Sequence, residues 1–555
     1  MTSDPTRAGP APPAAPPSRG HAVLVAAGIF LSRIAGLVRQ GVLSYFLGTS
    51  GAMSAFTAAM RIPNFLQNLL GEGVLSASLI PVYSKLLAQK DEQTAGRVAG
   101  TVASFLALIT AAIVTLGVLF APLLVDLLAP GYEGEIRELT ILLVRILFPG
   151  IGLLVLSAWC LAVLNSHRQF FIPYAAPVLW NAAIIAALLT FAPGEGGGRV
   201  AVIAGWGVVA GAVLQLGIQV PFVLRRAVPI RLGIARRLEP VRQVVRNFVP
   251  VVFGRGVVQV SAFVDEIFAS YLGPAALGAI GYAYTIYLLP FSLFGMSVSA
   301  AELPEMSSAV GTEEEVRRRL RERLGAGLRQ ISFFVVPSVV AFLAIGDVLV
   351  AALYQRGRFG AESTRYVWYI VIGYAVGLLA GTLSRLYSSA FYALNDTRTP
   401  LKFAVVRVAL AAGLGWALAF PLRPALVRLI SDGLGAPIPD VAAATLGLGA
   451  VGLSFASGAV SWVELGLLRG AMRRRIGPLP ASGSFQLRLW GAAIAAGGAG
   501  LALGRIALPA YAAALHPISA AIVVAGAFGV VYLALCAALR VPEVRAITRR
   551  LGIRR

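Results

Sequence analysis

Long apolar stretches recur along this chain and are separated by short polar segments. A helix needs about 20 apolar residues to cross the hydrocarbon core of a bilayer, and windows of that length predict fourteen membrane-spanning helices. We place these spans at residues 22–47, 55–84, 98–129, 137–164, 172–193, 200–224, 247–272, 275–309, 328–354, 365–394, 401–421, 441–468, 486–508 and 516–539. Spans two and eight are long, and Pro63 and Pro290 are expected to interrupt them with kinks.

Basic residues gather in alternate segments between the spans. These segments are residues 85–97, 225–246, 317–329, 469–475 and the tail 540–555, whereas the other loops hold few cations. Lys and Arg concentrate in cytoplasmic loops of membrane proteins. The pattern therefore places these segments in the cytoplasm, and the even number of spans places both termini there.

The two halves of the chain repeat a unit of six spans. The stretch from Leu47 to Pro81 parallels the stretch from Leu272 to Pro304, and each has a proline midway. Six is even, so both copies have the same orientation, as in transporters built from two parallel halves. Spans one to six and seven to twelve should face each other across a central cavity, with the last two spans appended.

These observations predict an all-α polytopic membrane protein with a simple division of the chain. The expected units are a disordered tail (1–21), an N-lobe (22–224), a basic cytoplasmic linker (225–246), a C-lobe (247–468), a basic cytoplasmic loop (469–485), the last two spans (486–540) and a basic cytoplasmic tail (541–555).

Composition supports this class. The chain is 58% hydrophobic and 13% charged, which is more apolar surface than a soluble core can hide. Its net charge of +22 lies between the spans, where it would meet anionic heads of membrane lipids. Without a nucleic-acid-binding motif, nucleic acid is not an expected partner. Cys160 and Cys536 lie in separate apolar runs and indicate no disulfide.

Two arginines inside the first span carry the strongest functional signal. Arg33 and Arg39 flank Gly36 within a stretch that is otherwise almost entirely apolar. A cation at the bilayer centre costs roughly 3 kcal/mol on insertion scales, so it normally faces a wet or polar interior. A cavity with fixed positive charge suits an anion or a lipid with an anionic head.

Further embedded polar residues cluster at the start of each half. Arg61 and Glu72 lie in span two, and Arg255 and Asp265 lie in span seven. Glu72 is a candidate substrate contact, with a structural ion pair to Arg33 or Arg39 as the alternative. For Arg61, a snorkelling or structural role is as consistent with its position as contact with the substrate. Asp265 is the candidate site for a coupling monovalent cation or proton, and a salt bridge to a neighbouring helix is equally consistent with its position.

The sequence contains no catalytic constellation, phosphate-binding glycine loop or spaced His and Cys set for a metal. We therefore expect no enzymatic activity, no cofactor and no metal site, and transport would draw on an ion gradient or the membrane potential. Two segments outside the spans also have local predictions. The stretch 313–323 resembles an amphipathic helix, either on anionic lipid or as a solvated connector. Asn395 and Asp396 are expected to cap a helix.

Several motifs together resemble one known family. LSRIAGLVRQ (31–40), AFTAAMRIPNFLQNLLGEGVLSASLIPVYS (55–84), YQRGRFGAEST (354–364) and AFYALNDTRTP (390–400) are similar to the MurJ (MviN) family of lipid II flippases, over residues 22 to the last span. The resemblance implies two six-helix bundles around a cationic cavity and two extra helices that form a lipid-facing groove at 486–540. It also implies movement of lipid II, an undecaprenyl-diphosphate-linked peptidoglycan precursor, across the bacterial inner membrane by alternating access.

The resemblance assigns roles to individual residues. The family's functional arginines of the first span match Arg33 and Arg39, and its second-span glutamate matches Glu72. Two other cavity arginines of the family are replaced here by Gln67 and Thr285.

Acidic residues common in the family are likewise replaced, by Gln40 and Ser54. Arg255 is expected to restore one lost charge, so Arg33, Arg39 and Arg255 are expected to hold the diphosphate. Two other functions remain open: a flippase for another polyprenyl-diphosphate glycan, and a non-transporting scaffold for cell-wall synthesis.

Overall fold

The computed structural model describes residues 19–235, 237–307, 312–394, 396–433, 448–479, 483–504 and 516–544. Side chains are described for the same residues except 19–26, 226, 253–262, 300, 304 and 433. The proposed disordered tail lies almost wholly outside these residues, since the first helix begins at Arg19, and so does most of the C-terminal tail. Throughout the described ranges the regular structure is helical, as the apolar pattern predicts.

The first half of the chain forms eight helices. They are α1 (Arg19–Leu47), α2 (Gly51–Leu70), α3 (Glu72–Ala88), α4 (Glu92–Leu119), α5 (Ala121–Leu128), α6 (Gly134–Ser166), α7 (Phe171–Phe191) and α8 (Gly197–Arg226). The second half contains α9 (Glu239–Ser270), α10 (Ala276–Pro290), the π-helix η1 (Phe291–Met296), α11 (Ser297–Ser307), α12 (Glu313–Tyr354), α13 (Ala361–Ala393), α14 (Arg398–Ala419), α15 (Arg423–Arg428), the π-helix η2 (Leu429–Gly433) and α17 (Leu448–Ile476). The last two helices are α18 (Gly483–Ala502) and α19 (Pro517–Ala538).

The described part of every predicted span falls on one helix or on consecutive helices. In the described part of the chain, eleven helical segments are long and apolar enough to cross a membrane. The helices at predicted spans one, seven and thirteen (α1, α9 and α18) are not among those eleven. The multi-pass membrane architecture is confirmed, and the count of fourteen crossings stays a prediction.

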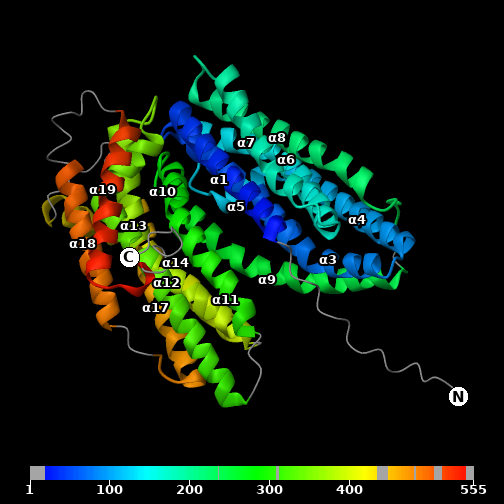
Figure 1. Ribbon diagram of the computed structural model, residues 1–555. Coiled ribbons are helices and arrows are strands. Elements are labelled where there is room, and N and C mark those ends of the chain that lie inside the picture. The colour runs from blue at the N-terminus through cyan, green and yellow to red at the C-terminus, as the bar shows by residue number, and fades with distance from the viewer. Residues whose placement is uncertain are drawn as a thin grey trace.

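The same helix pairings recur in both halves. In the first half α6 packs on α2, α4 and α8, and α7 packs on α1 and α8. In the second half α13 packs on α10, α12 and α17, and α14 packs on α9 and α17. Each pairing has its counterpart six spans later, as the internal repeat predicts. Figure 1 shows the two groups of helices side by side, with α18 and α19 at the outer edge of the second group.

The two proline-containing spans break at different places. The second span divides at Gly71, and Pro63 lies inside α2, so the prediction of a break at Pro63 is wrong. A Cβ on Gly71 would lie 2.2 Å from the backbone oxygen of Gln67, so only glycine fits this turn without a shift. The eighth span does change at its proline, because the π-helix η1 begins directly after Pro290.

The linker between the two halves is shorter than predicted. The segment between α8 and α9 runs from residue 227 to 238, since α9 begins at Glu239 with residues counted above as linker. Val241 and Val244 of α9 are buried with side chains of α3 and α4, so α9 packs on both halves. The stretch 313–323 is helical, as predicted, and forms the first part of α12. Thr312 and Glu315 form a capping box there.

Hydrogen bonds join the two halves along one end of the molecule, which we call the inter-lobe seam: residues 44–54, 131 and 195 against residues 270–282 and 354–363. The Gly278 N–H donates to Ser54 Oγ (2.9 Å), and the Arg358 N–H donates to the backbone oxygen of Tyr45 (2.9 Å). Four further contacts are Thr49 Oγ1 to Ser363 Oγ (2.7 Å), Tyr282 OH to the oxygen of Gly48 (3.1 Å), Ser44 Oγ to the oxygen of Tyr354 (3.3 Å) and Arg358 Nη2 to the oxygen of Glu195 (3.0 Å).

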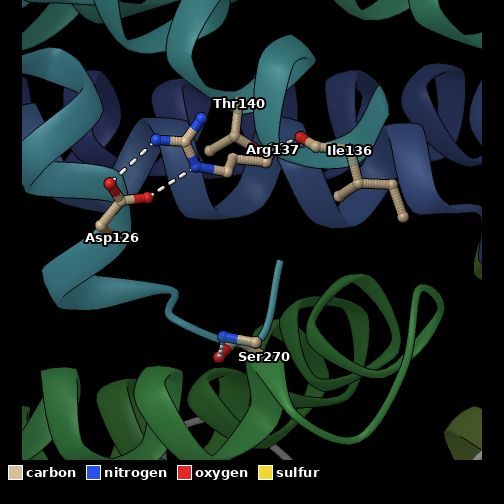
Figure 2. Close-up of polar contacts among 6 residues, drawn as sticks. Asp126, Ile136, Arg137, Thr140 and Ser270 are labelled. Atoms are coloured by element: carbon tan, nitrogen blue, oxygen red, sulfur yellow. Dashed lines mark hydrogen bonds and ion pairs between the residues drawn. The ribbon is translucent and has the colours of Figure 1, made fainter. Parts of the chain in front are cut away.

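The loop between α5 and α6 completes the seam. The Gly131 N–H donates to Ser270 Oγ (3.0 Å) at the end of α9, below the Asp126–Arg137 ion pair that ties α5 to α6 (Figure 2). A Cβ on Gly131 would lie 2.6 Å from backbone atoms of Ser270 and Tyr271. The loop therefore reaches this distance because residue 131 has no side chain. All seam residues belong to the cation-poor loops or to helix ends beside them.

Candidate functional site

A cavity of ≈ 560 Å³ lies between the first half and α10. Its polar lining residues are Ser32, Arg33, Arg39, Gln67, Glu72, Ser157, Tyr174, Trp180, Asn181, Gln215, Gln219 and Thr285. These residues come from α1, α2, α3, α6, α7, α8 and α10. The cavity is therefore built mainly by the first half and is bordered by the second through Thr285, Leu288 and Leu289.

Both arginines of the first span line this cavity. The Arg39 guanidinium lies over the Trp180 ring, with 4.8 Å between the guanidinium carbon and the ring centroid. Stacking on the ring face stabilises a cation in a poorly hydrated place. The Nε–H of Arg39 is buried and has no hydrogen-bond partner. Arg33 also borders the cavity but is more exposed.

The break at Gly71 brings two further predicted positions to the same wall. Gln67 lies in the last turn of α2, and Glu72 is the first residue of α3. In a continuous helix, five residues correspond to a net rotation of about 140°, so the two side chains would point to different sides. With the break, both side chains line the cavity. Thr285 reaches the cavity from the other half, and its Oγ1 also donates to the backbone oxygen of Gly281 (2.9 Å). Gln67 and Thr285, which stand where the resembled family has arginines, are thus cavity residues.

A neutral polar wall was missed by the sequence reasoning. Ser157 of α6 accepts hydrogen bonds from Gln215 Nε2 (3.0 Å) and Gln219 Nε2 (2.8 Å) of α8. Asn181 of α7 lies nearby in the same lining. The spacing of Gln215 and Gln219, one helical turn apart within an apolar span, is the signal that could have found them.

Arg61 and Asp265 lie outside this lining. Arg61 interacts electrostatically with Asp265 and with Glu266, whose side chain is completely buried. Asp265 also lies within electrostatic reach of Arg407 on α14. Arg407 in turn forms an ion pair with Glu464 on α17 (3.3 Å). The structure thus brings Arg61 and Asp265 together as charged neighbours and separates both from Arg33, Arg39 and Glu72.

Arg255 lies on α9, and its side chain is outside the described residues. The same holds for Gln259, with which it shares a helix face by sequence spacing. Metal chemistry has no candidate among the described residues, since none of them forms a group of three or more His, Cys, Asp or Glu side chains that could hold an ion. Cys160 and Cys536 are free and buried.

Known proteins match this chain over most of its length. The family model described as lipid II flippase MurJ matches residues 43–534. The chain is 31% identical to the lipid II flippase MurJ of Burkholderia cenocepacia over 69% of this chain and 75% of that protein. It is 28% identical to the probable lipid II flippase MurJ of Haemophilus influenzae over 70% of this chain and 78% of that protein.

Solved structures show the same fold. A lipid II flippase MurJ in an inward closed conformation superposes with a TM-score of 0.71 at 21% identity, covering 96% of this chain and all of that one. An inward-facing multidrug resistance transporter of the MATE family gives a TM-score of 0.62 at 16% identity, covering 82% of this chain and 98% of that one. Because the family model covers most of the sequence, the chain belongs to the lipid II flippase MurJ family.

Proposed function

We propose that this protein is a lipid II flippase that moves the undecaprenyl-diphosphate-linked peptidoglycan precursor from the cytoplasmic to the outer leaflet of the bacterial inner membrane. The observation that carries the proposal is the cavity between the two halves with Arg33 and Arg39 in its wall. Membership of a transporter family supports the expectation that the protein is not an enzyme.

Arg33 and Arg39 bind the diphosphate in this proposal. Arginine presents several N–H donors in a planar fork that matches phosphate oxygens, and such charge-assisted hydrogen bonds are roughly twice as strong as neutral ones. The Arg39 ring contact leaves the edge of the guanidinium available, and its unpartnered Nε–H is a donor of the kind required. Glu72, Arg61 and Arg255 are further substrate contacts in this proposal. Glu72 lines the cavity, whereas Arg61 would act from outside the present lining.

Opening of the inter-lobe seam would let the head group move outward. Under the proposed topology the cation-poor loops are external and both termini are cytoplasmic. The hydrogen bonds of the seam then close the molecule on the outside. Breaking these bonds and rocking the two halves would open the cavity outward, while the polyprenyl tail stays in lipid along a groove at α18 and α19.

Asp265 is the proposed site of coupling to a monovalent ion or proton. It lies on α9, which packs on both halves, and it is close to the cations Arg61 and Arg407. A change in its charge would alter its attraction to Arg61 on α2 and to Arg407 on α14 at once. Loss of ion dependence in Asp265→Asn with retained lipid binding would support this assignment.

The test is complementation of a strain depleted of its lipid II flippase. Rescue of growth and appearance of lipid II in the outer leaflet are expected for this protein and not for its Arg33→Ala, Arg39→Ala double variant. A flippase for another polyprenyl-diphosphate glycan, which Gln67 and Thr285 favour, would rescue a strain lacking that flippase and fail here. A non-transporting scaffold would leave the lipid in the inner leaflet in either strain.

A further inference from the structure

Four buried polar atoms without a protein partner lie around the cavity. They are Arg39 Nε, Trp180 Nε1, Asn181 Oδ1 and Gln219 Oε1. Asn181 is 4% exposed and Gln219 is 1% exposed. A buried polar atom that makes no hydrogen bond destabilises the folded protein and is therefore uncommon. Four such atoms around one cavity indicate that the lining is arranged for a ligand.

The four atoms divide by chemistry. Arg39 Nε–H and Trp180 Nε1–H are donors, since neither group can accept a hydrogen bond. They lie together, because the guanidinium of Arg39 stacks on the Trp180 ring. Asn181 Oδ1 and Gln219 Oε1 are acceptors. The residues that line the cavity thus carry both donors and acceptors that lack a partner.

The acceptors are held in place by their own amide nitrogens. Gln219 Nε2 donates to Ser157 Oγ (2.8 Å), and Asn181 Nδ2 donates to the backbone oxygen of Pro177 (2.8 Å). The Pro177 carbonyl can only accept a hydrogen bond, so this contact settles which end of the Asn181 amide carries the oxygen. Gln215 Nε2 also donates to Ser157 Oγ (3.0 Å), so Ser157 fixes both glutamines.

We propose that Asn181 and Gln219, positioned by Pro177 and Ser157, form a subsite for the first sugar of the lipid-linked head group and recognise its N–H and O–H donors. This inference rests on the proposed function, because the sugar must be attached to a diphosphate bound at Arg33 and Arg39. A ligand that satisfies both kinds of group carries acceptor oxygens next to donor groups. A diphosphate joined directly to a sugar with hydroxyl and acetamido groups has that order.

This subsite bears on specificity. A site built to hydrogen-bond a ligand donor rejects an analogue that lacks it, because the buried acceptors of the site are then left without a partner. The wall therefore favours a glycan-bearing lipid over the bare lipid diphosphate, which the arginines alone would hold. The subsite also offsets the replacement of arginines by Gln67 and Thr285. Part of the binding free energy then comes from contacts to the sugar and less of it from contacts to the diphosphate.

The experiment compares two probes on the purified full-length protein: undecaprenyl diphosphate and lipid II. Each neutral hydrogen bond contributes about 0.5–1.5 kcal/mol, which corresponds to roughly 2–13-fold in affinity. Gln219→Leu and Asn181→Leu should each weaken lipid II binding by roughly that factor and leave undecaprenyl diphosphate binding unchanged.

Thr110 on α4 provides a control. Its Oγ1 is buried without a partner, yet it lies outside the cavity lining. Thr110→Val should change neither affinity. Because the readout is a ratio of two affinities, a partly unfolded preparation does not alter it.

Three results would overturn the subsite. Equal loss of both affinities in Gln219→Leu would assign the residue to packing. Unchanged lipid II affinity in both leucine variants, with Arg39→Ala losing both ligands, would remove the subsite and leave the proposed flippase function intact. If the unmodified protein binds neither probe, both the subsite and the proposed flippase function are wrong.

Discussion

At the scale of single residues, the site combines a fixed cation with an aromatic support. Arg39 has no carboxylate partner among the described ion pairs, and the Trp180 ring carries its guanidinium instead. A ring face stabilises the cation without neutralising its charge. The charge therefore remains available to an anion, which a salt bridge would have removed.

Arg39→Ala should abolish complementation of a lipid II flippase depletion strain at normal protein levels. Loss of a charged hydrogen-bonding group costs about 1.5–3 kcal/mol, or roughly 10–160-fold in affinity. Arg39→Lys should be intermediate, because lysine keeps the charge but loses the planar stacking fork. Arg145→Ala on α6, at an arginine outside the cavity lining, is the control and should complement. Full complementation by Arg39→Ala would contradict the diphosphate role.

Exchanging charges separates ligand binding from internal pairing. Arg39 and Glu72 line one cavity, so the double variant Arg39→Glu, Glu72→Arg keeps the net charge. A structural pair would tolerate this exchange, whereas a diphosphate site would not, since the cation has left the Trp180 ring. We expect growth to fail in both single variants and in the double variant. Recovery of growth in the double variant alone would show that the residues serve each other.

The charged part of the site could be predicted from the sequence, and the neutral part could not. Arg33 and Arg39 stand out because a cation inside an apolar span is costly and rare. Asn181 and Gln219 cost far less inside a membrane, so their presence in a span carries little information alone. Their importance depends on which helices meet, since Ser157 of α6 holds Gln219 of α8.

At the scale of elements, the break between α2 and α3 sets the geometry of the cavity. The sequence reasoning chose Pro63 because proline removes a helix hydrogen bond. Gly71 breaks the helix instead, and its N–H still donates to the backbone oxygen of Gln67 (2.8 Å). The spans were predictable from long apolar windows, and the repeat was predictable from matching stretches in the two halves. The exact site of a break depends on a close backbone approach that no residue pattern reports.

Gly71→Ala should destabilise the protein and reduce transport. The new Cβ would lie 2.2 Å from the backbone oxygen of Gln67, so the turn must shift, and strain of this kind typically costs about 1–3 kcal/mol. The shift would move Glu72 relative to Arg39. Thermal unfolding in detergent and the flipping rate are the measurements. Gly325→Ala in α12, where a Cβ meets nothing within 4 Å, should be neutral or slightly stabilising.

The stability of the turn between α13 and α14 should depend on pH because of Asp396. Its carboxylate accepts from the backbone N–H groups of Thr399 and Arg398 (3.0 and 3.1 Å) and pairs with Arg475 on α17 (2.6 Å). The capping role expected for Asp396 is confirmed, while Asn395 lies outside the described residues. The backbone hydrogen bond from Thr399, followed by its hydroxyl and the Arg475 charge, holds the pKa of Asp396 below its usual value.

The sign of that pH dependence follows from the lowered pKa. Stabilisation by Asp396 is fully present above the unfolded-state pKa, about 3.9, and is lost as the pH falls through the lower folded-state value. Asp396→Asn should therefore unfold more easily than the unmodified protein at neutral pH, and the difference should shrink in acid. A difference that stays constant from pH 7 to pH 3 would contradict a role for the charged form.

At the scale of the whole molecule, the two halves meet along a seam of small polar residues. Apart from the bond from the Arg358 guanidinium to the oxygen of Glu195, its hydrogen bonds join hydroxyls and backbone groups, and no ion pair between the two sides of the seam occurs among the described residues. Neutral hydrogen bonds are worth about 1 kcal/mol each, so the seam can close the cavity and still open within a transport cycle. α9 spans the junction, because it packs on α2 and α3 as well as on α14 and α17.

Locking the seam should stop transport without preventing substrate binding. Thr49 Oγ1 and Ser363 Oγ lie 2.7 Å apart across the seam, so cysteines at these positions can form a disulfide after a small adjustment. The native Cys160 and Cys536 are buried and should not compete. The Thr49→Cys, Ser363→Cys protein should lose flipping under oxidising conditions and regain it with a reductant. Lipid II binding should persist in the locked state, because the cavity at Arg33 and Arg39 remains formed.

Each single cysteine variant should transport under both conditions. Continued flipping by the fully cross-linked protein would show that the halves need not separate here, and alternating access across this seam would be wrong.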